Sequence, residues 1–379
     1  MANDPSVYIP KLIAKTLPVL RENAQTARLV NTGYSLSPQE KGSSVTIPKS
    51  VAITAGNATP SNTPPSVTDV TPTSVSITLD QWKDADFHLT DQELTRIQAD
   101  DDFIPMQLAE CVKALVNTID SAVLGQYVDV YEYAGTAGTT PFASNVTAWT
   151  TGARARLNAN LAPLSQRAVM LDVDAEANAI GLQAFQDQSW RGDGAGIIEA
   201  QIGRKLGADW FMNQNIPTHT RGTLTGSPLI NDASVSVGQA TVDMDAGSLT
   251  GTVVAGDVFT VAGDTQTYTV TAGQTASGNA LTAVAFSPAA KVAWADNAAV
   301  TFVASHVANL AFHRDAFGLA FAPLPVEDGN PNMAYITDPV TGISLRLEKV
   351  REWKQTVFNL DVLYGVECIR PELACRIAG

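Results

Sequence analysis

The chain has 379 residues, of which 45% are hydrophobic, and a formal net charge of −14 with 24 Lys plus Arg. This length exceeds what one compact core usually organises, so we expect several domains, or one domain with a large insertion. Phosphate neutralisation needs clustered cations, and so acidic a chain offers no general electrostatic attraction to nucleic acid. Specific DNA recognition is therefore excluded as a leading function.

We expect no membrane span, because no stretch reaches the roughly eighteen consecutive apolar residues that a membrane helix needs. The amino terminus lacks the pattern of a secretory signal. Cys111, Cys368 and Cys375 are odd in number and far from metal-ligand spacing, which favours free thiols in a reducing cytoplasm. The acidity also suits a container wall that encloses polyanionic DNA without adhering to it.

Residues 1–35 predict a short amphipathic arm in which Pro18 interrupts an approximate helical stripe. The apolar positions of this arm are Ile9, Leu12, Ile13, Leu17 and Leu20, and its basic positions are Lys11, Lys15, Arg21 and Arg28. Two interpretations fit this pattern equally well. The arm is either a helix packed on its own domain or a segment that reaches a neighbouring subunit.

Residues 36–88 predict an extended two-stranded tongue. Residues 44–47 and 74–79 alternate between polar and apolar side chains, as strands do. The segment between them is rich in Ser and Thr and contains Gly56, Pro60, Pro64, Pro65 and Pro72. A tongue whose tip is this polar cannot own a core, so it needs a partner surface.

A long helix is the strongest prediction of secondary structure. Thr90 and Glu93 form a capping-box pair ahead of a short helix, and a second helix starts at Asp101, Asp102 and Pro105. Apolar residues at helical spacing then predict one core-facing stripe over residues 104–127. The stripe consists of Ile104, Leu108, Val112, Leu115, Ile119 and Val123, while Glu110, Lys113, Asn117 and Asp120 occupy other faces.

The next segment predicts an α/β layer. Helical spacing returns at Trp149, Ala153, Leu157 and Leu161, and residues 167–171 read as a short buried strand that enters another helix. Residues 208–211 then predict a strand that ends in the polar turn Asn213-Gln214-Asn215.

Residues 222–305 predict an inserted all-β module, because the composition changes abruptly. Between Arg221 and Lys291 there is no Lys or Arg, and short alternating runs appear at residues 258–261 and 267–270. Turn signals repeat at the spacing expected of a small barrel or sandwich, at residues 255–257, 262–264 and 276–278.

The last segment returns to mixed structure and contains a strand that is long for a globular protein. Its side chains on one face are expected to be Phe358, Leu360, Val362, Tyr364, Val366 and Cys368.

The histidines do not form a metal site by sequence. His88, His219, His306 and His313 lie away from Cys or carboxylates at ligand spacing. The spacing of His306 and His313 would let them share one helix face, and we expect each of these two to be a surface or half-buried histidine.

Two further motifs resemble ligand loops and fail on inspection. Asp172 to Glu176 starts like a calcium loop, but Ala177 and Gln183 stand where Gly and a bidentate Glu belong, so these carboxylates are expected to cap the following helix. Residues 192–196 lack a preceding strand and a following Lys-Ser/Thr, so they predict a loop rather than a phosphate cradle. We therefore expect no catalytic, cofactor-binding or metal-binding residues and no cofactor.

The order of these segments resembles the major coat proteins of tailed phages, in particular those of short-tailed phages whose shell subunit carries an inserted β domain. The arm, tongue and long helix look like the family's N-arm, extended loop and spine helix. Residues 207–220, GADWFMNQNIPTHT, are similar to the segment that leads into the inserted domain. Residues 312–317, 363–366 and 369–372 resemble the family's return into its axial and peripheral domains.

The resemblance implies an α+β fold of the tailed-phage and herpesvirus major capsid type, with an inserted small all-β domain. The expected divisions are an N-terminal arm (1–35), an extended β-loop (36–88), a peripheral domain with the spine helix (89–140), an axial domain (141–221), the inserted β-barrel-like domain (222–305) and a return segment that completes the axial and peripheral domains (306–379).

The function that the resemblance implies is structural and not enzymatic. Many copies would assemble as hexamers and pentamers into an icosahedral virion shell in the bacterial host cytoplasm. The shell would enclose double-stranded DNA without specific recognition, with scaffolding protein and portal as further partners and no membrane. Some family members crosslink neighbouring subunits through a Lys and an Asn; Lys49 is a positional candidate only, and that chemistry is not carried over.

Two alternatives stay open from the residues alone. One is an adhesin or tail component whose β module binds a host carbohydrate or receptor, against which the long central helix argues. The other is an enzyme with a β-rich accessory domain.

Overall fold

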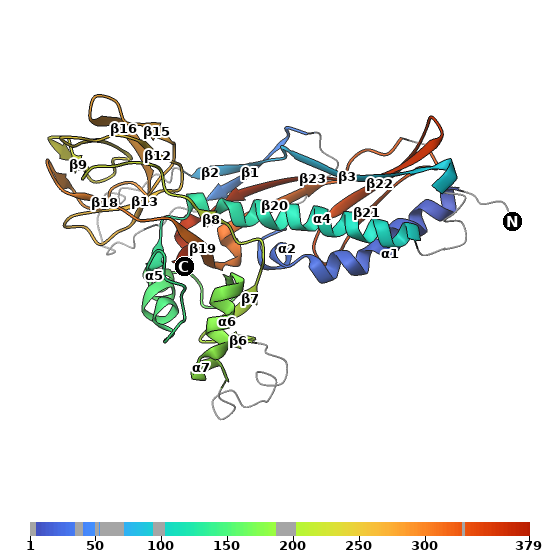
Figure 1. Cartoon of the computed structure of the whole chain (residues 1–379), viewed down its shortest axis with the longest axis horizontal. Coiled ribbons are helices and arrows are strands. Elements are labelled where there is room, and N and C mark those ends of the chain that lie inside the picture. The colour runs from blue at the N-terminus through green and yellow to red at the C-terminus, as the bar shows by residue number, and fades with distance from the viewer. Residues whose placement is uncertain are drawn as a thin grey trace, which may run out of the picture.

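The computed structural model of the protein describes residues 5–34, 41–49, 53, 72–93, 103–186, 202–327 and 330–379. The molecule is elongated, with a long helix and a long sheet along its body, a β-rich lobe at one end and a smaller α/β lobe to the side (Figure 1). Three predicted features lie outside the described residues: the tongue tip from residue 54 to 71, the helix start at Asp101 and Asp102, and the loop at 192–196.

Helix α4, Phe103–Gly125, confirms the predicted long helix. Its apolar stripe is almost fully buried, with Leu108, Val112, Leu115, Ile119 and Val123 at most 3% exposed. Off this stripe, Lys113 and Glu110 form an ion pair on the surface. Amphipathic patterning therefore located both the helix and the face that it buries.

Helix α1, Pro5–Asn23, packs along α4 and settles the two interpretations of the arm in favour of its own body. Its apolar residues Ile9, Leu12, Ile13 and Leu20 join the core that contains the α4 stripe. The predicted interruption at Pro18 is wrong, because the helix runs through this residue. Burial of its apolar face against α4 outweighs the missing proline N–H. A short helix, α2 (Thr26–Leu29), follows.

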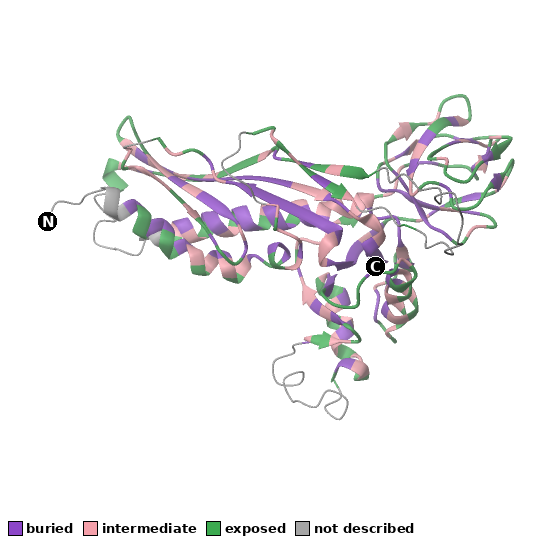
Figure 2. Ribbon diagram, turned by 180° about the vertical axis from the view of Figure 1, so that it is seen from behind, coloured by how far each residue is buried: buried purple, intermediate pink, exposed green. Residues whose placement is uncertain are grey.

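The long sheet is built around strand β23, Gln355–Cys368. Strand β3 pairs with β23 along one side, β22 and then β20 pair along the other, and β21 adds to the far edge of β22. The bounds are β3 Gln81–Thr90, β20 Phe317–Ala322, β21 Met333–Thr337 and β22 Ser344–Glu352. One face of this sheet packs against α4 and α1, as the buried band in Figure 2 shows.

The prediction of one apolar face on β23 holds only in part. Phe358, Leu360, Val362 and Tyr364 do face the α4 core. Residues 361–365, however, are buried on both faces. The tongue covers the second face at Leu363 and Gly365, and alternation of side chains cannot reveal such a cover.

The tongue is formed by β1 (Ser44–Lys49) and β2 (Thr73–Thr78), which pair antiparallel as predicted. Ile47 and Ile77 bury its base against the sheet face opposite α4, in a small core that includes Leu363. The backbone approaches closely at Gly365, where an added Cβ would lie 2.2 Å from the Thr78 carbonyl oxygen. Only glycine at position 365 allows the tongue backbone to lie this close to β23.

The capping box is confirmed. The Glu93 carboxylate accepts from the Thr90 backbone N–H at 3.0 Å, and the Thr90 hydroxyl accepts from the Glu93 N–H at 3.3 Å. This pair ends β3 and starts the next helical turn, as the spacing predicts.

A second sheet forms the side lobe and joins it to the body. Its strand order is β4-β24-β19-β5-β7-β6, with β8 paired to β19. The bounds are β4 Tyr133–Gly135, β5 Arg167–Leu171, β6 Arg204–Lys205, β7 Ala208–Met212, β8 Thr218–His219, β19 His306–His313 and β24 Ala374–Ala378. The predicted strands at residues 167–171 and 208–211 are both present.

Helices of the side lobe agree less closely with prediction. A π-helix, Ala148–Ala153, leads into α5, Arg154–Ala159, and α6, Val173–Gly181, follows β5, with α7, Gln183–Gln186, after it. Leu161 lies beyond α5, 87% exposed, so the helical stripe is shorter than predicted. The Asp172 side chain accepts from the Asp174 N–H and caps α6, as predicted.

The β-rich lobe, residues 222–305, is called the β module here. Its strands are β9 Leu229–Ile230, β10 Ser234–Val235, β11 Thr241–Asp245, β12 Thr252–Val253, β13 Val258–Val261, β14 Tyr268–Val270, β15 Gln274–Thr275, β16 Ala280–Ser287, β17 Trp294–Ala295 and β18 Val300–Phe302. The main sheet of the module has six strands in the order β18-β13-β14-β16-β11-β9. Its apolar core is distinct from that of the body.

The two ends of the β module meet. The Arg221 N–H donates to the Ser305 hydroxyl at 3.0 Å, and just outside it β8 pairs with β19 through His219 and His306. When the two ends of an inserted segment lie next to each other, the rest of the chain can fold without that segment.

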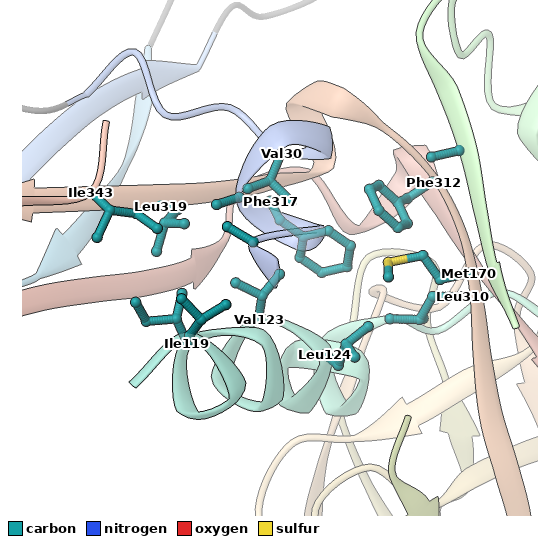
Figure 3. Packing of buried hydrophobic residues seen from close by; sticks show 14 of the residues in the cluster. Val30, Ile119, Val123, Leu124, Met170, Leu310, Phe312, Phe317, Leu319 and Ile343 are labelled. Carbon is teal, nitrogen blue, oxygen red and sulfur yellow. The ribbon is translucent and has the colours of Figure 1, made fainter. Parts of the chain in front are cut away.

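The main core is densest where the end of α4 meets both sheets (Figure 3). Val123 and Leu124 from α4 lie beside Phe317 of the long sheet and Leu310 of the second sheet. Helix α4 therefore holds the two sheets in one body.

We expect Leu115→Ala to lower the free energy of unfolding by about 2–5 kcal/mol, because it leaves a cavity under the α4 stripe. Chemical denaturation measures this. Met106→Ala, on the same helix at a 55% exposed position, is the control and should change stability little. Equal stability of Leu115→Ala and the parent would mean that the stripe is not a core.

We also expect residues 222–305 to fold when expressed alone, since they have their own apolar core and adjacent ends. The fragment should give a sheet-rich circular dichroism spectrum and a cooperative thermal transition. Narrow amide proton dispersion in its NMR spectrum would show that it depends on the body.

Candidate functional site

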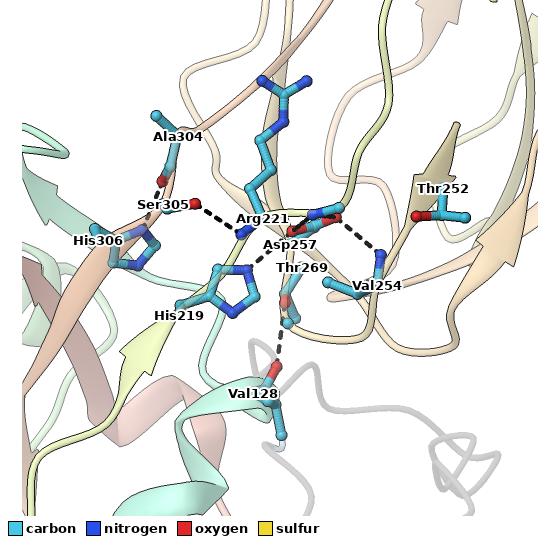
Figure 4. A network of polar contacts seen from close by, with 12 residues as sticks. Val128, His219, Arg221, Thr252, Val254, Asp257, Thr269, Ala304, Ser305 and His306 are labelled. Atoms are coloured by element: carbon cyan, nitrogen blue, oxygen red, sulfur yellow. Dashed lines mark hydrogen bonds and ion pairs between the residues drawn. The ribbon is translucent and has the colours of Figure 1, made fainter. Parts of the chain in front are cut away.

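The site with the densest buried polar contacts is the junction between the β module and the body, shown in part in Figure 4. It gathers side chains from four places: the short helix η1 (Gln126–Asp129) after α4, strands β8 and β19, the β module itself and the C-terminal strand β24. We call this set the junction network.

Arg376 of β24 lies at the centre of the junction network and is fully buried. Its Nε donates to the Val130 carbonyl at 2.7 Å, and its Nη1 donates to the Gly256 carbonyl at 2.7 Å. Its Nη2 donates to the Val128 carbonyl and to the Thr269 hydroxyl, each at 3.1 Å. Gly256 and Thr269 belong to the β module, whereas Val128 and Val130 belong to the body. One guanidinium therefore ties the two parts together.

The charge of Arg376 is balanced without a direct carboxylate contact. Its guanidinium lies 5.1 Å from the centroid of the Tyr127 ring, a cation–π arrangement. Burial lowers the pKa of Arg376 to about 10, while Tyr127, Asp129 and Asp257 oppose that shift. The side chain is thus still charged at neutral pH.

Asp257 organises the entrance to the β module. Its carboxylate accepts from His219 Nε2 at 2.9 Å, from the Val254 N–H at 2.9 Å and from the Gly222 N–H at 3.3 Å (Figure 4). Since the carboxylate accepts from Nε2, His219 Nδ1 is free to accept from the Tyr127 hydroxyl at 3.1 Å.

His306 lies beside His219, with ring centroids 5.4 Å apart. Its Nδ1 lies 2.9 Å from the Ala304 carbonyl oxygen, which requires Nδ1 to carry the proton. Its Nε2 is buried without a hydrogen-bond partner. Burial lowers the pKa of His306 to about 4, and Arg376 and His219 add to the lowering.

The β module also approaches the body closely at Gly256. This residue has a positive φ of 91°, and an added Cβ would lie 2.9 Å from Val128 Cγ1. Hydroxyls of the module complete the seat, because Thr267 Oγ1 donates to the Tyr131 carbonyl at 2.7 Å and Thr269 Oγ1 donates to the Val128 carbonyl at 3.1 Å.

Several predictions about individual side chains need correction. His306 and His313 are buried rather than at the surface, and His219 is buried as well. His306 and His313 lie at the two ends of strand β19, not on a helix, because seven residues at strand rise separate them. His88 is exposed on β3, and Lys49 ends β1 in the tongue.

The central residues of the junction network are not predicted from the sequence. Asp257 stands within one of the predicted turns, and no motif singles out Arg376. One signal was available: Arg376 is the single charge in the apolar strand Ala374–Ala378, and a buried arginine must be hydrogen-bonded.

The junction network consists of fixed hydrogen bonds among buried groups that join the β module to the body. Within the described ranges, no group of three or more His, Cys, Asp or Glu side chains could hold a metal ion. In the same part of the chain, no helix is long and apolar enough to cross a bilayer. The three cysteines are buried free thiols.

Comparison with known proteins gives structural matches only. Neither a family model nor a curated protein sequence matches the chain. A solved structure from Mycobacterium phage Che8 superposes with a TM-score of 0.51 at 14% identity, over 93% of this chain and 90% of that chain. For the capsid structure of cyanophage P-SCSP1u the TM-score is 0.49 at 12% identity, over 91% of this chain and 86% of that chain. The mature capsid of bacteriophage PhiM1 gives 0.46 at 11%, also over 91% and 86%.

The match to the Che8 structure spans nearly the whole of both chains and shows a shared fold. The chain therefore shares the mixed α+β fold of the Che8 structure, in agreement with the expected α+β fold class.

We expect the protein to lose stability as the pH falls from about 6.5 to about 4. In that window the unfolded chain binds a proton at His306 that the folded chain does not bind, because its folded-state pKa is depressed. Above the unfolded-state pKa this difference vanishes. Thermal unfolding across the window should show a shallower decline for His306→Gln, whereas the exposed-site control His88→Gln should follow the parent. Parallel curves for all three proteins would contradict this account.

Proposed function

We propose that this chain is a major capsid protein, a structural subunit without catalysis that self-assembles into the icosahedral shell around a phage DNA genome. The observation that carries the proposal is the fold: a long helix braced on a long sheet, with a two-stranded tongue projecting from it. The proposed shell consists of hexamers and pentamers of this chain.

The tongue gives energetic support. In its described strands β1 and β2, Ile47 and Ile77 are the buried side chains, while those of Thr46 and Ser76 bond to each other on an exposed face. A two-stranded ribbon is marginal in water by itself. Contact with a neighbouring subunit would stabilise it, so assembly and subunit folding would be linked.

The domain divisions belong to the same proposal. We take residues 1–35 as the arm, 36–88 as the extended loop, 89–140 as the peripheral domain with the spine helix, 141–221 as the axial domain, 222–305 as the inserted domain and 306–379 as the return segment that completes the axial and peripheral domains. The separate apolar core of the β module and its adjacent ends support the last boundary. Residues 81–88 also pair with β23 in the long sheet.

The remaining partners follow from charge and family. A formal charge of −14 suits a wall that encloses double-stranded DNA without binding it specifically. Scaffolding protein and portal are the proposed assembly partners, and the bacterial host cytoplasm is the proposed place of assembly.

Co-expression with a scaffolding partner should yield closed hollow particles of uniform curvature in electron micrographs. Gly365→Val should reduce the particle yield sharply, because its side chain would displace the tongue from its seat at Thr78. The matched control is Gly247→Val, at an exposed glycine that, like Gly365, does not have a positive φ and where an added Cβ meets nothing within 4 Å. Monomers, fibres or small rings alone from the parent chain would overturn the proposal.

A further inference from the structure

The face of the long sheet opposite α4 has an unusual composition. Successive side chains of a strand alternate between faces, and paired residues share a face. Because Phe358, Leu360 and Phe87 point into the α4 core, the intervening residues occupy the opposite face. At its β20 end this face is covered by the tongue base. We call the rest the acidic face; it consists of Trp82, Asp84, Asp86, Tyr335, Glu348, Val350, Glu352 and Asp361.

Large apolar side chains are exposed on the acidic face. Trp82 is 46% exposed and Tyr335 is 58% exposed, and Val350 is exposed between them and the β22–β23 turn. At that turn Trp353 is 86% exposed. Tyr and Trp are enriched among the residues that dominate binding at protein interfaces. An exposed cluster of this kind on one sheet face therefore marks an interaction surface.

Carboxylates on the same face repel one another in the free subunit. Asp84 on β3 lies directly opposite Asp361 on β23, and Asp86 is two residues along. Like charges at directly opposed positions destabilise a sheet. Arg346 is the single Lys or Arg that the paired strands place on this face, and its guanidinium bonds to Asp361. Further positive charge on the face would relieve the repulsion.

Arg346 also shows how the face receives a cation. Its guanidinium lies 5.9 Å from the Trp82 ring centroid while bonding to the Asp361 carboxylate. An aromatic ring and a carboxylate thus share one cation. Asp361 is 2% exposed, and its Oδ1 and the Asn359 Oδ1 are buried acceptors without a donor. Both acceptors, like the buried Arg346 Nε donor, lack a hydrogen-bond partner within the subunit.

We propose that the acidic face is the docking surface for a basic segment of a different protein, with Lys or Arg side chains between apolar anchors. A second copy of the chain is a poorer occupant, because the apolar side chains of its one basic amphipathic segment, the arm, are already buried against α4. The chain has a net charge of −14, and its own segment 50–71 contains no Lys or Arg. Basic side chains would bind the carboxylates and the Trp82 and Tyr335 rings, and the apolar anchors would cover Val350.

The test uses the full-length protein and an amphipathic Lys/Leu peptide helix as the probe, with a Glu/Leu peptide of the same pattern as its charge-reversed counterpart. Titration calorimetry should detect the Lys/Leu peptide only, with affinity that falls as salt rises. Replacing Asp84 and Asp86 by Asn and Glu348 by Gln should weaken that affinity by about tenfold or more. Hydrogen exchange should show protection of β3 and β22 on binding.

The matched control changes the same number of carboxylates elsewhere. Glu22→Gln, Glu110→Gln and Asp296→Asn, all exposed and away from the acidic face, should leave the affinity for the peptide unchanged. Equal loss in both triple variants would mean general attraction to an acidic chain and would overturn the proposal. Unchanged affinity in the acidic-face variant would overturn it as well. So would a change in self-association, measured by sedimentation, as the only effect of those substitutions, because the occupant would then be a second copy.

Discussion

Burial of one helical stripe sets the shape of this protein. Helix α4 presents its apolar side chains to the long sheet along its full length, and the same helix touches the second sheet at its end through Leu124. A helix of this length fixes how far the body extends. The arm, the long sheet and the side lobe all pack against this one surface, so each depends on the stripe remaining buried.

A second constraint operates where α4 stops. After α4 the chain turns through η1, which leaves the Val128 and Val130 carbonyls without a backbone N–H partner in a helix. Arg376 donates hydrogen bonds to both of them and to the Gly256 carbonyl of the β module. Removing a buried guanidinium leaves several acceptors without donors, which is costly. The position of the β module is thus specified by polar contacts of fixed direction, whereas the body is held by apolar packing. The uncharged state of His306 belongs to the same arrangement, because a second buried positive charge would oppose Arg376.

The sequence predicted what depends on periodicity and composition. Helix α4 and its buried face, strands β1, β2, β5 and β7, the Thr90–Glu93 capping box and the β-rich character of residues 222–305 all follow from local patterns. The misses come from tertiary contacts. Packing on α4 carries α1 through Pro18, and strand β3 was not foreseen because its charged outer side chains obscure the alternation. Arg376 and Asp257 lie far apart in the chain, and one sequence contains no signal that they share a site.

The adjacent ends of the β module have a practical consequence for engineering. Because Arg221 and Ser305 are hydrogen-bonded neighbours, a foreign domain or epitope whose termini lie close together can replace the module without stretching the body. The graft site is not neutral, however. Some replacements lack acceptors equivalent to the Gly256 carbonyl and the Thr269 hydroxyl. Part of the buried Arg376 guanidinium would then have no hydrogen-bond partner. A display scaffold built on this chain should therefore keep Arg376, which also satisfies the Val128 and Val130 carbonyls of the body, and should use a replacement that supplies the missing acceptors.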